Sequence, residues 1–341
     1  STDDVQRCRG LAQNLGVPLL VEGEREGGGA GGAGAQTGDF RFTLSFDEAG
    51  RLALGQPGSG FKPLAVDFSG GKTGHRAKNQ QGTEQVVKAA ALPKRRAATA
   101  AAAAAADVDG RRTSSGGGCG DVEEEGQPLL WDLTAGLGTD SFVLALAGWR
   151  VEMFERSAVV AAMVQDALDR ARAGEDETAR IAASRMSLVV GDSTDAAVER
   201  VAGQDGGGGG QGGGGAAAAT RRPAVVYLDP MFPQKNKSAL VKKGMQMLQA
   251  LLEEDGGERR GATQQGHGED DIGGGRGGGG GGEREGEERR LFDAAMSVAT
   301  RKVVVKRPVH GAAIVGHVAP SHAVVSKNGR FDVYVVKQQQ Q

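Results

Sequence analysis

The sequence predicts an α/β protein with a mostly parallel sheet, an antiparallel edge strand and a small N-terminal subdomain that contains strands. From Pro128 onward, short apolar runs alternate with segments whose apolar residues recur at helical spacing. The chain then ends in two short apolar runs joined by a turn, which favours an antiparallel pair added to a parallel sheet.

Glycine and alanine tracts divide the chain into regions. Of the 341 residues, 58 are glycine without a collagen period, which indicates low-complexity insertions rather than additional core. We expect an N-terminal subdomain over residues 1–92, a low-complexity insertion over 93–127 and the main domain over 128–337. Within the main domain, unstructured insertions are expected at about 203–221 and 253–288.

Charge and cysteine content limit the classes of function. The whole chain carries −2 and the segment from Glu253 to Arg290 carries −5, so the remainder carries +3, which is compatible with an RNA partner but does not require one. Cys8 and Cys119 form no CxxC pattern, so we expect no disulfide framework, no metal site and a reducing compartment. The longest apolar run, Ala100–Ala106, is shorter than the ~20 residues of a membrane span, so we expect no membrane association.

Each region has its own predicted elements. In the N-terminal subdomain we expect strands over Gly16–Glu22, a hairpin over Asp39–Leu54 that turns at 47–50, a strand over Leu64–Phe68 and a helix over Thr83–Ala91. In the main domain the predicted strands are Leu129–Leu133, Arg150–Phe154, Ser187–Val190, Ala224–Leu228, Lys302–Lys306, Ala323–Ser326 and Arg330–Val336. The predicted helices there are Asp140–Ala147, Ala158–Ala173, Ser238–Leu252 and Leu291–Ala299.

A glycine-containing loop follows the first strand of the main domain. Asp132 ends that strand, and Gly136 and Gly138 let the backbone turn tightly and approach a ligand before the next helix begins. Glu155 ends the following strand, where a carboxylate can accept hydrogen bonds from both hydroxyls of a ribose. The loop and the acid together predict a nucleotide-like cofactor, and a purely structural turn is the alternative.

Two residues of this loop favour S-adenosylmethionine over a nicotinamide cofactor. Ser141 stands where the third glycine of the dinucleotide-binding GxGxxG pattern belongs. Asp140 would place a negative charge where a helix N-terminus binds pyrophosphate, whereas it suits the cationic methionine end of S-adenosylmethionine. A dehydrogenase is therefore the last of the alternatives.

The segment Asp229-Pro230-Met231-Phe232-Pro233 follows another buried strand and predicts the chemistry. The prolines stiffen the turn and fix the Asp229 carboxylate as an acceptor for the N–H groups of an exocyclic amine. Phe232 offers a stacking face for a base outside its helix. Asp229, Pro230 and Phe232 are the predicted catalytic residues of a methyl transfer that depends on positioning and electrostatics. A proline-rich loop without such a role is the alternative.

Other polar residues near these loops are further candidates. Asp192 and Ser193 follow the strand Ser187–Val190 and could contact an adenine, although an ordinary helix N-cap is the alternative. Basic residues that could hold RNA phosphates are His75, Arg76, Lys235, Lys237, Lys242, Lys243, Lys306 and Arg307. For the lysines, a solvated helix face is the alternative.

Several stretches that contain these candidate residues resemble a known family, the bacterial small-subunit ribosomal RNA guanine-N2 methyltransferases of the J type. The matching stretches include VDFSGGKTGHR, DLTAGLGTDSFVLA and VVYLDPMFPQKNKSALVKK. The resemblance implies a class I, Rossmann-like fold that transfers a methyl group from S-adenosylmethionine to the 2-amino group of a guanine in 16S-type ribosomal RNA. It also implies cofactor contacts at Thr139, Asp140, Glu155, Arg156, Asp192, Ser193 and Asp229.

The resemblance further implies a cytoplasmic protein whose partner is small-subunit ribosomal RNA or the assembling small subunit, and we expect a monomer. The glycine, alanine and acidic insertions depart from the family and indicate a eukaryotic version, for which an organellar ribosome would be the substrate. Two alternatives remain open: an amino-methyltransferase that acts on DNA or a protein amide, and a nucleic-acid-binding module with a decayed cofactor pocket. Glu155 and Asp229 argue against decay, because drift would remove such costly charges.

Overall fold

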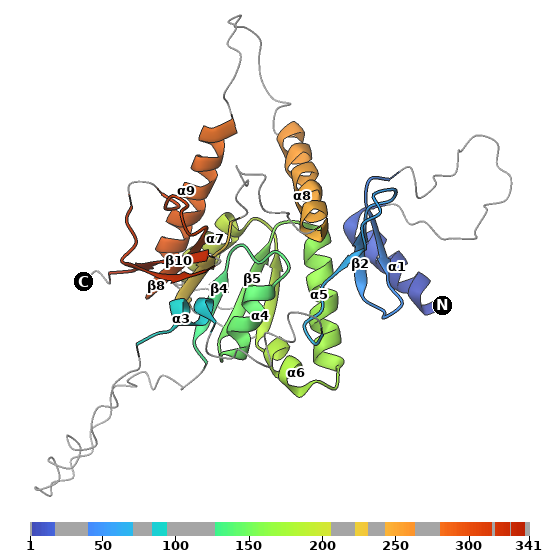
Figure 1. The fold of residues 1–341 in the computed structure, drawn as a ribbon, viewed down its shortest axis with the longest axis horizontal. Coiled ribbons are helices and arrows are strands. Elements are labelled where there is room, and N and C mark those ends of the chain that lie inside the picture. The colour runs from blue at the N-terminus through green and yellow to red at the C-terminus, as the bar shows by residue number, and fades with distance from the viewer. Residues whose placement is uncertain are drawn as a thin grey trace, which may run out of the picture.

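The fold is described by a computed structural model, which covers residues 2–17, 40–70, 84–93, 127–205, 222–230, 243–262, 280–315, 318–327 and 329–337. Its main sheet consists of β4 (Leu129–Asp132), β5 (Arg150–Glu155), β6 (Met186–Val190), β7 (Val225–Leu228), β8 (Lys302–Arg307), β9 (His322–Ser326) and β10 (Gly329–Val335). These seven strands lie in the order β6-β5-β4-β7-β8-β10-β9 (Figure 1).

Strand directions confirm the predicted mostly parallel sheet with an antiparallel edge. The strands β6, β5, β4, β7 and β8 pair in parallel, with Asp132 opposite Tyr227 and Glu155 opposite Val190. β10 runs antiparallel to both of its neighbours, β8 and the edge strand β9. The parallel strands therefore all end at one edge of the sheet, which is where open α/β folds bind ligands.

Helices cover both faces of this sheet. The helices α3 (Gln85–Ala90), α4 (Thr139–Leu146), α5 (Ala158–Ala173) and α6 (Glu177–Ser184) pack on one face, and α7 (Ser193–Asp205) and α9 (Gly280–Val298) pack on the other. Consecutive residues of β4 point into different cores, since Leu130 lies in the first cluster and Trp131 in the second. Burial on both faces explains why the strands are continuous apolar runs rather than alternating ones.

A small antiparallel sheet lies beside α5 (Figure 1). It contains β1 (Thr43–Phe46), β2 (Leu52–Gly55) and β3 (Leu64–Ala65), and α1 (Thr2–Leu15) accompanies it. The backbone N–H of Leu52 donates to Asp166 Oδ2 on α5 at 3.0 Å, and Arg170 Nη2 on the same helix donates to the carbonyl oxygen of Val66 at 2.6 Å. Phe68 stacks on Phe142 of α4 with 4.7 Å between ring centroids, so the N-terminal segment reaches the loop after β4.

The structure corrects several predicted elements. The helix α1 was not predicted, and Gly16, expected to start a strand, instead ends that helix with a φ of 65°. The helix α6 was also not predicted. The helices α8 (Lys243–Ala262) and α9 extend into the segment 253–288 that was expected to be unstructured. Glu and Arg form helices well, and the glycine content concealed this tendency.

Candidate active site

The loop after β4 is shaped by two glycines with positive φ. Gly136 has a φ of 50°, and Gly138, the N-cap of α4, has a φ of 69°. A Cβ atom at Gly138 would lie 3.3 Å from the Phe68 ring and 3.4 Å from Met153 Sδ. Both the backbone conformation and the packing therefore require glycine at this position.

Glu155 fastens this loop to the end of β5. Its Oε2 accepts from the backbone N–H of Gly136 at 2.9 Å, and its Oε1 accepts from that of Ser157 at 2.8 Å. Burial raises the pKa of Glu155, although these hydrogen bonds oppose the shift. Each carboxylate oxygen has a second lone pair, so Glu155 can order the loop and still accept a hydrogen bond from a ligand hydroxyl.

Asp132, at the end of β4, is buried under the same loop. Its Oδ1 accepts from the backbone N–H of Thr134 at 3.0 Å, and its Oδ2 accepts from Ser141 Oγ at 2.5 Å. Burial raises the pKa of Asp132 to about 7, against the opposing effect of the Ser141 hydrogen bond. Asp132 therefore lies beneath the loop as a support that changes charge near neutral pH.

Two further carboxylates meet beside Asp132, one on α4 and one after β7. Tyr227 Oη donates to Asp140 Oδ2 at 2.8 Å. Lys306 Nζ on β8 lies 2.7 Å from Asp140 Oδ2 and 2.7 Å from Asp229 Oδ2. We call these five residues, Asp132, Asp140, Tyr227, Asp229 and Lys306, the carboxylate cluster. The backbone N–H of Asp229 also donates to Thr134 Oγ1 at 2.6 Å, which ties the loop after β7 to the loop after β4.

The members of the carboxylate cluster shift each other's pKa values. Burial raises the pKa of Asp229, and the Lys306 ammonium opposes this shift. Burial alone would lower the pKa of Lys306, but Asp140 and Asp229 outweigh it and raise that pKa. Burial and the neighbouring Asp140 charge raise the pKa of Tyr227, which therefore stays a neutral donor. The cluster holds more acids than cations, which suits a ligand with a positive charge.

The remaining predicted cofactor residues lie at the same edge of the sheet. Asp192 follows β6 and caps α7, because its Oδ1 accepts from the backbone N–H of Thr194 at 2.9 Å. The capping role is thus present, and it does not exclude a ligand contact by this exposed carboxylate. Arg156 follows Glu155 and is exposed, whereas Thr139 begins α4 and is half-buried.

Only three of the predicted RNA contacts lie in the described residues. Lys243 is exposed at the start of α8, with Nζ 5.3 Å from the centroid of the Phe61 ring. Lys306 belongs to the carboxylate cluster. Arg307 is 7% exposed, donates through Nε to the carbonyl oxygen of Ala312 at 2.7 Å and lies beside Glu288, which argues against a contact with an RNA phosphate. His75, Arg76, Lys235, Lys237 and Lys242 lie outside the described residues, as does Phe232.

Sequence reasoning missed Tyr227 and the part that Lys306 plays. Tyr227 stands on a strand that is otherwise aliphatic, VVYL, and Lys306 follows the valine run of KVVVKR. The sequence could have indicated these residues, because each is a polar group at the carboxyl end of a buried strand and a buried Tyr hydroxyl needs a hydrogen-bond partner. The identity of that partner depends on the order of the strands, which the sequence does not display.

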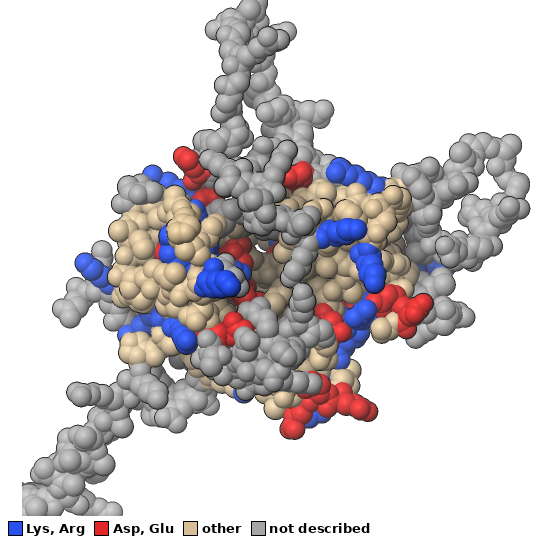
Figure 2. Space-filling model, in the orientation of Figure 1, with Lys and Arg blue, Asp and Glu red and all other residues tan. Residues whose placement is uncertain are grey.

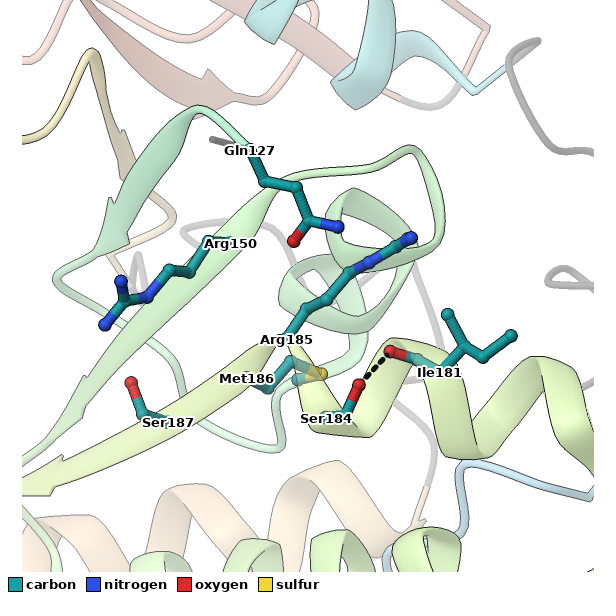
Figure 3. A pocket seen from close by; sticks show the side chains of 7 residues that line it. All are labelled: Gln127, Arg150, Ile181, Ser184, Arg185, Met186 and Ser187. Carbon is teal, nitrogen blue, oxygen red and sulfur yellow. Dashed lines mark hydrogen bonds between the residues drawn. The ribbon is translucent and has the colours of Figure 1, made fainter. Parts of the chain in front are cut away.

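Other features of the described residues lie away from this edge. A cavity of about 470 Å³ is lined by residues that include Arg150, Arg185 and Met186, whose side chains are drawn in Figure 3. Arg150 and Met186 begin β5 and β6, so this cavity lies at the edge opposite to the carboxylate cluster.

On the face drawn in Figure 2, acidic and basic side chains of the described residues are interspersed. Within the described part of the chain, no helix is long and apolar enough to cross a membrane, and no group of His, Cys, Asp or Glu is placed to hold a metal ion.

The glycine loop and the surplus of negative charge fit S-adenosylmethionine. Gly138 turns the backbone at the edge of the sheet with a φ of 69°, where a Cβ would be strained and would crowd Phe68 and Met153. Asp140 and Asp229 share one ammonium, that of Lys306, so the carboxylates beside the loop keep a surplus of negative charge that would favour a cationic ligand. Glu155, at the end of β5, is a carboxylate that could accept hydrogen bonds from the hydroxyls of a ribose.

Comparison with known proteins agrees with this geometry. A family profile of SAM-dependent methyltransferases matches residues 118–260 and 282–336. Ribosomal RNA small subunit methyltransferase J of Pseudomonas aeruginosa is 30% identical over 339 residues, which cover 99% of this chain and 93% of that protein. The protein of the same name from Chromohalobacter salexigens is 33% identical over 327 residues, which cover 96% and 93%.

A solved structure shares the fold. The SAM-dependent methyltransferase of Neisseria gonorrhoeae superposes with a TM-score of 0.55 at 22% sequence identity and covers 98% of this chain and 93% of its own. At this identity the likeness concerns the fold alone, and the family follows from the sequence matches. The chain is a SAM-dependent methyltransferase and belongs to the family of ribosomal RNA small subunit methyltransferase J.

Proposed function

We propose that this enzyme methylates the exocyclic N2 amine of a guanine in small-subunit ribosomal RNA. The observation that carries the proposal is the carboxylate cluster, which places Asp229 directly beside the glycine loop of the cofactor site. The names of the relatives support ribosomal RNA as the substrate class. The proposed substrate implies a compartment that contains ribosomes.

The cofactor would be held by residues from the ends of three adjacent strands. Gly136, Gly138 and Thr139 offer backbone at the loop after β4, with Asp132 as its buried support. Glu155 and Arg156 after β5 are proposed to meet the ribose side, and Asp192 and Ser193 after β6 the adenine. Asp140 is proposed to face the cationic methionine end. When bound, S-adenosylmethionine supplies an electrophilic methyl group.

Asp229 is proposed to grip the acceptor amine. An exocyclic amine is a weak nucleophile because its lone pair is delocalised into the ring. A carboxylate that accepts one of its N–H bonds holds the nitrogen in place and favours the lone pair for attack. When the N–C bond forms, the bond between the methyl group and sulfur would break with S-adenosylhomocysteine as the leaving group, and the nitrogen would become positively charged and have to lose a proton. The raised pKa of Asp229, which burial causes, makes that carboxylate a suitable acceptor for the proton.

Pro230 and Phe232 complete the proposed acceptor side. Pro230 follows Asp229 at the point where the chain leaves β7, and its fixed φ limits the motion of the carboxylate. Phe232 is proposed to stack on the guanine, and Lys235, Lys237, Lys242 and Lys243 are proposed to hold RNA phosphates nearby. An amine of DNA or a protein amide would suit Asp229 equally well, so the substrate class must be measured.

The test is transfer of a tritiated methyl group from S-adenosylmethionine, followed by nucleoside analysis. The acceptors are naked small-subunit ribosomal RNA without modifications, the assembled small subunit, duplex DNA and total ribosomal protein. We expect label only in the ribosomal RNA, whether naked or assembled, and only as N2-methylguanosine. Label in another nucleoside, in DNA or in protein would refute the proposal.

A matched pair of variants shows that the label comes from the proposed site. Asp229→Asn removes the carboxylate charge in the carboxylate cluster, whereas Asp169→Asn removes a carboxylate on the outer side of α5, where the side chain is 61% exposed. We expect the first variant to lose transfer while it still binds S-adenosylhomocysteine, and the second to retain transfer. Equal activity of the two variants would separate the reaction from Asp229.

A further inference from the structure

Lys306 lies at the carboxyl end of β8, with its ammonium between carboxylates from two different elements. Its Nζ is 2.7 Å from Asp140 Oδ2 on α4 and 2.7 Å from Asp229 Oδ2 after β7. The side chains of Lys306, Asp229 and Asp140 are 36%, 37% and 14% exposed, so the contact lies at the rim of the site. Ion pairs at such a rim contribute little to folding, which points to a role in the chemistry.

The contacts fix the Asp229 carboxylate without using all of its acceptor capacity. Lys306 engages Oδ2, and the backbone N–H of Asp229 is held by Thr134 Oγ1 at 2.6 Å. A carboxylate has about four acceptor positions, so its remaining lone pairs can accept from a substrate N–H. Lys306 itself cannot take the proton of the amine, because it is already protonated and its neighbours raise its pKa.

Charge explains why a cation is needed at this position. Asp229 faces Asp140 from α4, Asp132 from β4 and Tyr227 from its own strand, and Lys306 from β8 is the positive charge beside them among the described residues. Two carboxylates that lie close together do not both ionise unless a cation offsets their repulsion. A protonated Asp229 would present a donor to the amine instead of an acceptor.

We propose that Lys306 is a positioning residue of methyl transfer, which holds Asp229 against Asp140 and keeps it ionised as the acceptor for the amine N–H. The proposal rests on the proposed role of Asp229 but not on the identity of the nucleobase. It assigns Lys306 to the reaction rather than to contact with RNA phosphates.

The test compares the pH dependence of kcat in wild type, Lys306→Met and Lys306→Arg at saturating cofactor and RNA. Lys302→Met is the control, because Lys302 is another lysine of β8, and among the described residues it donates to the carbonyl oxygens of Ala89 and Ala91 rather than to carboxylates. We expect the acid limb of the profile to move up by about 1–3 pH units in Lys306→Met, the shift that one close opposite charge produces. Lys306→Arg should return the limb to the wild-type position, and Lys302→Met should leave it there. An unchanged limb in Lys306→Met overturns the proposal, as does an equal shift in Lys302→Met.

A second measurement needs no turnover and so separates this proposal from the proposed function. The carboxyl carbon of Asp229 is titrated by carbon-13 NMR in wild type and in Lys306→Met, without RNA. We expect the pKa of Asp229 to rise by about 1–3 units in the variant, and an unchanged value overturns the proposal. If Lys306→Met does not fold, Lys306→Gln serves instead, because it also removes the ammonium: the pKa of Asp229 should again rise, and an unchanged value or a fall overturns the proposal.

Discussion

Lys302 and Lys306 stand four residues apart on β8, and their ammonium groups meet opposite surroundings. Lys302, at the amino end, donates to the carbonyl oxygens of Ala89 at 2.8 Å and Ala91 at 2.6 Å, which end α3. Lys306, at the carboxyl end, donates to the carboxylates of Asp140 and Asp229. Burial lowers the pKa of Lys302, whereas the two carboxylates outweigh burial at Lys306 and raise its pKa.

The amino end of β8 supports the structure through Lys302, whereas the carboxyl end is proposed to act in the reaction through Lys306. The carbonyl groups at the C-terminus of α3 carry a partial negative charge that no proton can remove, so Lys302 binds them across a wide range of pH. This contact fastens α3, which precedes the main domain in sequence, to the main sheet. The partners of Lys306 are acids whose charge depends on pH and on each other. We therefore expect changes at the amino edge to alter stability and changes at the carboxyl edge to alter turnover.

The largest effect is expected from Asp229→Ala at the carboxyl edge. This variant loses the proposed acceptor of the amine N–H, so kcat should fall by about 10³-fold, the cost of removing one preorganised hydrogen-bond partner of a transition state. The side chain is 37% exposed, so the circular dichroism spectrum should change little. Turnover close to that of the wild type would remove Asp229 from the mechanism.

The two glycines at the ends of α4 should respond differently to substitution by alanine. Gly138→Ala places a methyl group 3.3 Å from the Phe68 ring at a φ of 69°, which should cost about 3 kcal/mol of unfolding free energy and weaken cofactor binding. Gly148→Ala, at a φ of 98° with nothing within 4 Å of the new atom, should cost about 1 kcal/mol from the backbone alone. Urea unfolding and calorimetric titration with S-adenosylhomocysteine measure both. Equal losses of cofactor affinity would contradict the distinction between the two ends.

At the amino edge, Lys302→Met should lower stability without changing the chemistry. The carbonyl oxygens of Ala89 and Ala91 lose their donor in a buried place, which should reduce the unfolding free energy by about 2 kcal/mol. We expect kcat at the pH optimum to stay within about twofold of the wild type, since no group of the carboxylate cluster is touched. Thermal unfolding and steady-state kinetics decide this. A large fall in kcat with unchanged stability would show that the two edges are not separate.

A separate effect, which depends on pH, concerns Asp132, whose pKa burial raises to about 7, from about 3.9 in an unfolded chain. Between these values the folded state holds one more proton than the unfolded state, so this residue makes stability fall as pH rises. Asp132→Asn removes this dependence. From pH 4 to pH 7 the variant should therefore gain on the wild type by about 1.4 kcal/mol per pH unit in unfolding free energy. A constant difference between the two proteins across that range would contradict the assignment.

The local sequence pattern was sufficient to predict some elements of the main domain, among them a helix and a strand. The helix Ala158–Ala173 was predicted with its observed bounds, because apolar residues recur at helical spacing between Ser157 and Gly174. The β-branched run before Lys306 likewise predicted β8 within one residue of its observed end. In contrast, α8 and α9 extend beyond the predicted helices. Their added residues include Glu and Arg, which form helices well, but the many glycines among them led to the prediction of unstructured segments.

The sequence alone determined the α/β class, the glycine loop after β4 and the acids at Asp132, Asp140, Glu155 and Asp229, since each follows from a short segment and its neighbours. Only the tertiary structure decided which of these groups meet. Asp140 and Lys306 are 166 residues apart and Asp229 and Lys306 are 77 apart, and the strand order β4-β7-β8 brings them together. Pairing across a sheet depends on contacts between distant segments, and no local pattern encodes the partner of a lysine at the end of a strand.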